Sequence, residues 1–341
     1  MEAKKRVILA DQKFSWKKSL LQWEVFLLLI FIAVNIMNAF VSPYYLSVSG
    51  LFTATSSFLE KAFVALPMAY ILVLGDIDIS VGATVALSSV MMGVAYANFG
   101  LPMIVCVLIC LLTGTICGLI NGLILSRFPE LAPMIVTLGT QILYRGIGTM
   151  ILEDQAATGL TSVTWFSNLY WGYLGPIPYM LIIFVICAIG FGVVLHKTTF
   201  GRRLYAIGSN SVASMYAGIH VQKIRLIVFT LTGLFAGVTA LFLTARMGST
   251  RPNIAEGYEL DAISMVVLGG FSTSGGKGRF IGAIISIFII GFLRYGLGLI
   301  NVPSQAMLII IGALLICAVM LPNLKLGQFF KSIFSKKKVT A

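Results

Sequence analysis

Two aspartates, Asp76 and Asp78, are the residues most able to do chemistry in this chain, because they lie between long apolar runs in the stretch LGDIDISVGATVALSS. A carboxylate in the hydrocarbon region of a bilayer costs several kcal/mol, so the pair needs a structural or a functional role. A divalent cation is one candidate partner. A magnesium site, however, needs further oxygen ligands and usually a substrate phosphate, and no second acidic cluster lies within an apolar run. The pair therefore does not predict a metal site.

No pattern typical of a catalytic site accompanies the two aspartates. His196 and His220 do not form the HExxH pattern of a zinc protease. The stretch GGFSTSGGKGRF looks like a phosphate-binding loop, but Phe271 stands where the first glycine is required, and Gly278 stands where a Ser or Thr would bind Mg²⁺. We therefore expect no catalytic residue and no bound cofactor in this chain. If the protein uses ATP and Mg²⁺, they must bind a partner ATPase.

The composition is that of a polytopic membrane protein. Hydrophobic residues make up 58% of the 341 residues and charged residues only 11%, whereas a soluble domain has about 25% charged residues. The net charge of +12 does not indicate nucleic-acid binding, because the basic residues gather in short segments between apolar runs. The five cysteines all lie in apolar runs, and their spacing predicts neither a zinc site nor a disulfide framework.

Apolar stretches of about 20 residues predict membrane-spanning helices, and ten such stretches position the polar residues named above. The eighth is short, so we expect it to be tilted, broken or re-entrant. The predicted spans are 24–42, 59–75, 79–98, 101–126, 131–151, 178–196, 224–246, 259–272, 279–300 and 303–321.

Charge predicts how these spans are oriented. With the N-terminus in the cytoplasm, ten spans return the C-terminus to the cytoplasm, and most of the 24 Lys and Arg residues then lie on the inside, as the positive-inside rule requires. No cleavable signal peptide is evident. The fold class is thus an all-α polytopic membrane protein with both termini cytoplasmic. We expect one transmembrane domain over 1–341, made of a cytoplasmic segment (1–23), a helical bundle (24–321) and a basic cytoplasmic tail (322–341).

Glycines recur at a spacing of four within two of the predicted spans. A spacing of four places them on one face of a helix, where two backbones approach closely. We expect these faces to pack two helices together within one protomer, and a contact between two copies is the less favoured alternative. The residues are Gly114, Gly118 and Gly122 in one span, and Gly233 and Gly237 in another.

The longest inner connection, 197–223, is polar enough to leave the membrane. Asn210 or Ser211 is a typical N-cap for a short helix through Ala217, and Gly218 is a typical residue to end it. The connection is longer than a helical bundle requires. We therefore favour a docking element for a cytoplasmic partner over an ordinary interfacial helix.

Five stretches resemble the permeases of the ribose, xylose, rhamnose and autoinducer-2 group of bacterial ABC importers, in order along residues 60–320. They are GDIDISVGA, GLINGLIL, PMIVTLGT, FGRRLYAIGSNSVASMYAGI and GYELDAISMVVLGGFSTSGGKG. The resemblance implies an inner-membrane permease for a monosaccharide or sugar-like molecule. It also implies pairing with a second permease copy or paralogue, two cytoplasmic ABC ATPase domains and an extracytoplasmic sugar-binding protein.

The resemblance further implies that the stretch 200–219 carries a coupling helix that sits in the ATPase. It departs from the family at one position, because the family usually has Gly-Gly-Ile-Asp where this chain has Gly75, Asp76, Ile77 and Asp78. Asp78 therefore matches the family pattern and Asp76 does not. The expected coupling residues are Gly201, Arg202, Tyr205, Gly208, Asn210, Met215, Tyr216 and Gly218.

The turn around the two aspartates has two interpretations, which are compatible. Gly75 is able to end one helix in the left-handed conformation, and Asp78 or Ser80 to cap the next. The same turn is also able to supply a polar lining for a sugar path, because a sugar needs hydrogen-bond donors and acceptors with little net charge. The candidate path residues are Asp78, Asn121, Thr137, Gln141 and Asn301.

The outer face supplies a predicted docking surface for the binding protein. It consists of the outer loop 152–177 and charged residues in and beside the segment 247–258, namely Arg246, Arg251, Glu256 and Glu259. Two rival functions remain. A stand-alone ion-coupled secondary transporter would use Asp76 and Asp78 as coupling acids. A membrane-embedded enzyme is disfavoured, because no catalytic constellation is present.

Overall fold

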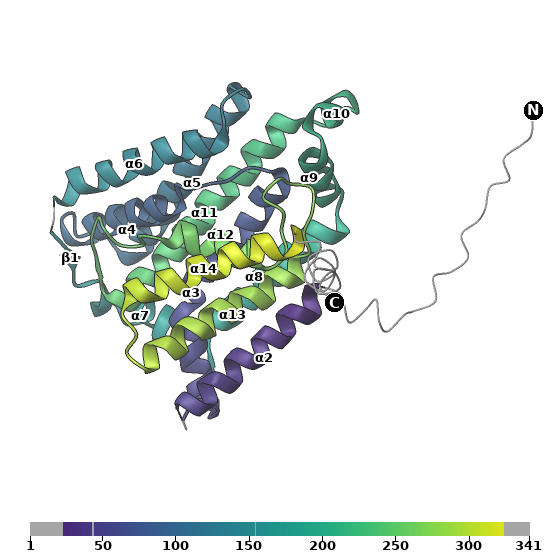
Figure 1. The fold of residues 1–341 in the computed structure, drawn as a ribbon. Coiled ribbons are helices and arrows are strands. Elements are labelled where there is room, and N and C mark those ends of the chain that lie inside the picture. Colours follow the sequence, from purple (N-terminus) through teal and green to yellow (C-terminus); the bar gives the residue numbers. More distant parts are fainter. Residues whose placement is uncertain (1–22, 43, 154, 324–341) are drawn as a thin grey trace, which may run out of the picture.

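The computed structural model describes residues 23–42, 44–153 and 155–323, and most of them are helical (Figure 1). The helices are α2 (Trp23–Val41), α3 (Val48–Leu74), α4 (Val81–Ala97), α5 (Met103–Arg127), α6 (Pro133–Leu152), η1 (Leu160–Ser162), α7 (Thr164–Trp171), α8 (Tyr179–Lys197), α9 (Thr199–Ser209), α10 (Ser211–Tyr216), α11 (Val221–Met247), α12 (Tyr258–Leu268), α13 (Phe280–Leu299) and α14 (Ser304–Asn323). Two short antiparallel pairs complete the fold: β1 (Ala157–Thr158) with β4 (Ser249–Thr250), and β2 (Tyr173–Leu174) with β3 (Ile177–Pro178).

The all-α polytopic architecture is confirmed. In the described part of the chain, seven helices are long and apolar enough to cross a membrane, and α4 and the segment Gln305–Leu314 are shorter apolar helices. Each predicted span coincides with a helix, although α3 begins at Val48 rather than at residue 59, and α12 has only 11 residues. The expected segment 1–23 and the tail 322–341 lie almost wholly outside the described residues.

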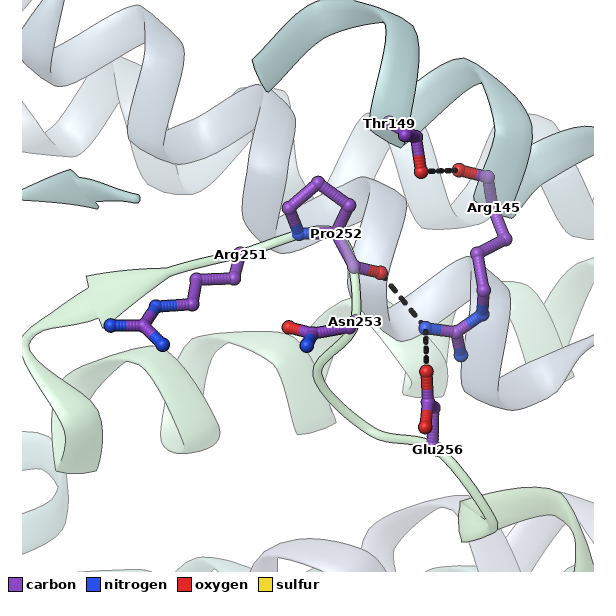
Figure 2. Close-up of a pocket in the computed structure, with 6 residues that line it drawn as sticks. All are labelled: Arg145, Thr149, Arg251, Pro252, Asn253 and Glu256. Atoms are coloured by element: carbon purple, nitrogen blue, oxygen red, sulfur yellow. Dashed lines mark hydrogen bonds and ion pairs between the residues drawn. The ribbon is translucent and has the colours of Figure 1, made fainter. Parts of the chain in front are cut away.

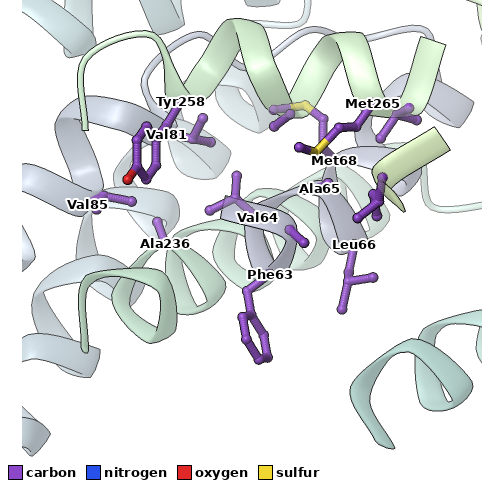
Figure 3. Close-up of a cluster of buried hydrophobic side chains, with 14 of the residues drawn as sticks. Phe63, Val64, Ala65, Leu66, Met68, Val81, Val85, Ala236, Tyr258 and Met265 are labelled. Atoms are coloured by element: carbon purple, nitrogen blue, oxygen red, sulfur yellow. The ribbon is translucent and has the colours of Figure 1, made fainter. Parts of the chain in front are cut away.

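Helix α3 forms the centre of the bundle. Nearly all its residues from Ala54 to Leu74 are buried, and they pack against α8, α11, α12 and α13. Figure 3 shows Met68 of α3 beside Met265 of α12, and Phe63 packs against Phe184 of α8 and Phe242 of α11. By contrast, α2, α6 and α8 expose many leucines and isoleucines, as expected of helices that face lipid.

The glycine faces pack α5 against α11, as the spacing predicted. A Cβ added at Gly114 or Gly118 would overlap the backbone of α11 at Gly233 and Phe229. Among the helix pairs, α5 and α11 share the most extensive contact. The close approach therefore lies within the protomer, and the helix-packing interpretation is confirmed.

Two non-helical connections interrupt the bundle. Helix α3 ends at Gly75 (φ +83°) and helix α11 ends at Gly248 (φ +66°), both left-handed, and each helix has 27 residues. The chain then runs without helix through 76–79 to α4, and through most of 249–257 to α12. Phe63 of α3 stacks on Phe242 of α11. The two connections meet where Gly82 of α4 lies against the carbonyl of Ala255.

Candidate functional site

The connection between α3 and α4 is held by the side chain of Asp78. Its Oδ1 accepts hydrogen bonds from the backbone N of Ser80 (2.9 Å) and from Ser80 Oγ (2.7 Å), and the residue is 2% exposed. This is an Asx turn that precedes the helix. Ser80 is the N-cap of α4, but its side chain makes no capping bond. The expected side-chain cap is therefore replaced by a turn that fixes the N-cap residue.

Polar groups from α5 and α6 extend this cluster. Asn121 Nδ2 donates to Ser80 Oγ (2.8 Å), and the hydroxyl of Tyr144 donates to Asn121 Oδ1 (3.2 Å). Thr137 Oγ1 accepts from the backbone N of Ile79 (3.2 Å). Three of the predicted path residues, Asp78, Asn121 and Thr137, thus lie together. Tyr144 was missed, although its position seven residues after Thr137 places it on the same side of a helix.

The remaining two path residues lie apart from that cluster. Gln141 reaches Glu259 instead, with 3.5 Å between Gln141 Nε2 and Glu259 Oε1. Asn301 is exposed, in a left-handed conformation (φ +56°), in the turn between α13 and α14. The structure therefore does not bring Asn301 to the polar cluster, because it serves as a turn residue between two helices.

Asp76 makes an ion pair that the sequence did not reveal. Its two oxygens accept from Nε (2.7 Å) and Nη2 (3.0 Å) of Arg225, in the bidentate geometry that favours arginine. Both side chains are largely buried, at 5% and 16% exposure. The pair ties the connection after α3 to the first turns of α11. Asp76 and Asp78 are thus distinct: one carboxylate is matched by a cation and the other is held by hydroxyl and amide groups.

The inner connection folds into α9 and α10 at one end of the bundle, far from β1 at the other end (Figure 1). Asn210 caps α10 as predicted, since Asn210 Oδ1 accepts from the backbone N of Ala213 (2.9 Å). The helix ends at Tyr216, and Gly218 follows in the left-handed conformation (φ +81°). Met215 and Tyr216 are exposed, Tyr216 by 90%. The short helix, its N-cap at Asn210 and the glycine that follows its end therefore agree with the sequence prediction.

The other predicted coupling residues divide into two groups. Arg202 is exposed, whereas Gly201 and Gly208 are glycines because a Cβ there would overlap the carbonyls of Leu195 and Val73. The hydroxyl of Tyr205 donates to the carbonyl of Gly278 (2.7 Å), and burial raises the pKa of Tyr205 to about 12. These inward-facing groups fasten α9 to the rest of the protein.

A cleft of about 410 Å³ opens beside the connection between α11 and α12, and its lining residues are shown in Figure 2. Arg145 of α6 donates to the carbonyls of Pro252 (2.8 Å) and Ile254 (3.1 Å), and lies 3.8 Å from Glu256. Arg251 and Glu256 are exposed, as a docking surface requires.

The other two predicted docking residues face inward. Arg246 Nη2 pairs with Glu60 Oε1 at 2.9 Å, and Glu60 also accepts from the hydroxyl of Tyr258. Glu259 is only 7% exposed. The Arg246 side chain is 34% exposed, so only Glu259 is buried, and the docking role of both residues stays a prediction. A charged side chain close to the end of a span is able to reach a partner inside the bundle, as Arg246 reaches Glu60. The positions of charges in the sequence do not reveal such a contact.

A second buried ion cluster fixes α12. Asp261 pairs with Lys61 of α3 (3.3 Å) and with Arg294 of α13. Both cations are largely shielded, with side-chain exposures of 18% and 20%. The cluster joins three helices around the start of α12.

Comparison with known proteins settles the family. Residues 50–319 match the family described as branched-chain amino acid transport system / permease component. The chain belongs to this permease family. The ribose import permease protein RbsC of Bacillus subtilis is 38% identical over 299 residues, which cover 88% of this chain and 91% of the relative. The autoinducer 2 import system permease protein LsrD of Escherichia coli K12 is 35% identical over 306 residues, with 87% and 91% covered. No solved structure matches the chain.

These relatives identify the class of protein. The chain is a permease subunit of an ABC importer in the bacterial inner membrane, and ATP hydrolysis lies with separate ATPase components of such importers. The permease family is therefore the one that the five sequence stretches had indicated.

Proposed function

We propose that this permease forms the path for a monosaccharide or sugar-like molecule of the ribose, xylose, rhamnose or autoinducer-2 class. The observation that carries this proposal is the polar cluster around Asp78, which offers hydroxyl, amide and carboxylate groups to a ligand. Such groups suit a molecule rich in hydroxyls. The neighbouring charge of Asp76 is matched by Arg225, so Asp76 adds no unpaired charge to the cluster. The relatives named for ribose and autoinducer-2 import support the same substrate class.

The proposed assembly follows the expected one. The permease has ten spans with both termini cytoplasmic and pairs with a second copy or paralogue. It works with two ABC ATPase domains, which bind ATP and Mg²⁺, and with an extracytoplasmic sugar-binding protein. Exposed Arg251 and Glu256, beside the outer cleft, form the proposed docking surface for that binding protein, where rim charges set association rate more than affinity.

Uptake into proteoliposomes tests the proposed function. We expect ATP-driven accumulation of one of ribose, xylose, rhamnose or autoinducer-2 when permease, ATPase and binding protein are all present. Omission of the ATPase or of ATP is expected to abolish accumulation. The measurement is radiolabelled substrate retained on filters. Uptake by the permease alone under an ion gradient would instead favour the secondary transporter that uses Asp76 and Asp78.

Helix α10 is the proposed contact for the ATPase. Met215 is half exposed beside the nearly fully exposed Tyr216, so Met215→Asp would place a charge in a dry contact without disturbing the fold. We expect co-purification of the ATPase to fall at least tenfold, since an unpaired charge in an interface costs about 1.4 kcal/mol or more. Affinity-tag pull-down of the ATPase from solubilised membranes measures this.

The matched control is Leu174→Asp, which places the same charge on an exposed apolar residue of β2 at the other end of the bundle. It is expected to retain the ATPase. Undiminished co-purification with Met215→Asp at normal permease yield would place the ATPase contact elsewhere.

A further inference from the structure

A polar stripe runs along α6. Its members recur every four residues, which places them along one side of a helix, and they are Thr137, Gln141, Arg145 and Thr149. The rest of the exposed surface of α6 is apolar, as at Ile135 and Ile142. An arginine and a glutamine within a spanning helix indicate a functional site.

The stripe touches both non-helical connections. Thr137 bonds to the connection before α4 at Ile79, and Arg145 bonds to the connection before α12 at Pro252 and Ile254. Gln141 lies between them and faces Glu259. The stripe thus extends from the outer cleft, which Arg145 and Thr149 line, toward the Asp78 cluster.

Glu259 has an incomplete set of partners. Glu259 is only 7% exposed to solvent. Its Oε2 has no hydrogen-bond partner among the residues that the structure describes. Its Oε1 has only the long 3.5 Å contact with Gln141. The ion pairs found in the described part of the chain engage Glu24, Glu60, Asp76, Glu256 and Asp261 but not Glu259. A buried carboxylate oxygen without a donor is unfavourable, so it is poised to accept one.

The backbone around Glu259 adds donors. The first turns of α4 and α12 meet here, because Gly82 lies against the Glu259 carboxylate and the Ala255 carbonyl. Neither helix has a side-chain cap, and the first backbone N–H groups of a helix have no partner within it. Ala255 itself is left-handed (φ +56°), a strained conformation that clusters at ligand sites. Interrupted helices in transporters commonly direct such termini at substrate.

We infer that Glu259, Gln141 and Arg145 form a binding subsite for hydroxyl groups of the transported molecule. The inference rests on the proposed function. It adds a second binding site on the proposed path, between the outer cleft and the Asp78 cluster. The Glu259 carboxylate accepts from one or two hydroxyls, while the Gln141 amide and the Arg145 guanidinium donate. The ligand class is a polyol, because its hydroxyls donate to the carboxylate and accept from the amide and the guanidinium. Arg145 lines the cleft, whereas Glu259 is buried, so a molecule in the cleft meets Arg145 before Glu259.

Uptake of a sugar and of its monodeoxy analogues, at matched permease levels, tests this subsite. The substrate is the sugar that the wild-type assembly transports, and each analogue lacks one hydroxyl. Glu259→Gln and Glu259→Ala are expected to raise the KM for the sugar by about 10- to 100-fold, the range for a hydrogen bond to a charged group. The KM for one analogue, the one that lacks the hydroxyl bound by Glu259, is expected to change less than threefold.

A rise in KM for the sugar but not for one analogue distinguishes a binding role of Glu259 from a purely structural role. A structural defect would raise the KM for the sugar and all analogues equally, or lower kcat alone, and either result would overturn the subsite. Glu259→Gln is nearly isosteric, so it keeps the test valid if Glu259→Ala does not fold. Glu130→Gln, a change at an exposed carboxylate, is the control and is expected to transport as wild type. If the wild-type assembly transports no sugar, the proposed function and the subsite both fail; if it does and KM ratios stay constant, only the subsite fails.

Discussion

Replacement of Asp76 by alanine is expected to lower the free energy of unfolding by about 3–5 kcal/mol, because it leaves Arg225 buried without its carboxylate. The pair is bidentate and largely shielded, so water does not replace the lost partner. Asp76→Gly should behave similarly, even though the resemblance to the permease group makes glycine the usual residue there. The measurement is the thermal unfolding midpoint of the detergent-solubilised permease.

A surface ion pair provides the control for this loss. Glu24 and Arg279 lie 3.0 Å apart, but the arginine side chain is 65% exposed, and exposed pairs contribute about 0–1 kcal/mol. Glu24→Ala should therefore shift the midpoint little. The double variant Asp76→Asn with Arg225→Gln should recover much of the loss, because no charge is then left unpaired. Equal midpoints for Asp76→Ala and Glu24→Ala would show that the buried pair does not stabilise the fold.

The same pair lies between α10, the proposed ATPase contact, and the polar cluster around Asp78. Arg225 lies in the second turn of α11, a few residues after α10, and Asp76 lies two residues before Asp78. A displacement of α10 by the ATPase would thus reach the polar cluster through one rigid contact.

Most of the helices could be predicted from the sequence because apolar length is a strong signal. The start of α3 was placed too late, at residue 59, because Thr55 and Ser57 look polar in a hydropathy reading. In the helix their hydroxyls donate to the carbonyls of Leu51 (2.8 Å) and Ala54 (2.6 Å), so they are satisfied within it. The short eighth span was expected to be tilted, broken or re-entrant, and α12 has only 11 residues and begins after a non-helical connection.

The candidate site was less predictable, because its pairs are distant in sequence. Asp76 and Arg225 are separated by 149 positions, and no local pattern links them. Glu259 was assigned to the outer face since acidic residues near the end of a span usually face water. Its burial depends on how α12 begins against Gly82 of α4, which only the packed bundle determines. Asn121 and Thr137 were selected as polar residues within predicted spans, and the structure buries both beside the connection that holds Asp78.

Replacement of Gly233 by leucine is expected to prevent stable assembly of the bundle. A Cβ at this position would overlap the carbonyl of Gly114 and the backbone of Gly118, and backbone atoms cannot turn aside as a side chain can. Overpacking by added methylenes typically costs about 1–3 kcal/mol where side chains yield, and the cost here exceeds that range because α5 itself must move. We expect little monodisperse permease in size-exclusion chromatography after solubilisation.

Gly190→Leu is the matched control, because Gly190 is also within a long apolar helix but no atom lies within 4 Å of where its Cβ would stand. Both variants lose the same flexible residue and gain the same apolar side chain, so a difference between them reports the close approach of α5 and α11 alone. Gly233→Ala should be intermediate, since a single methyl already meets the opposing backbone. Equal yields of folded protein for Gly233→Leu and Gly190→Leu would show that α5 and α11 do not depend on this backbone contact.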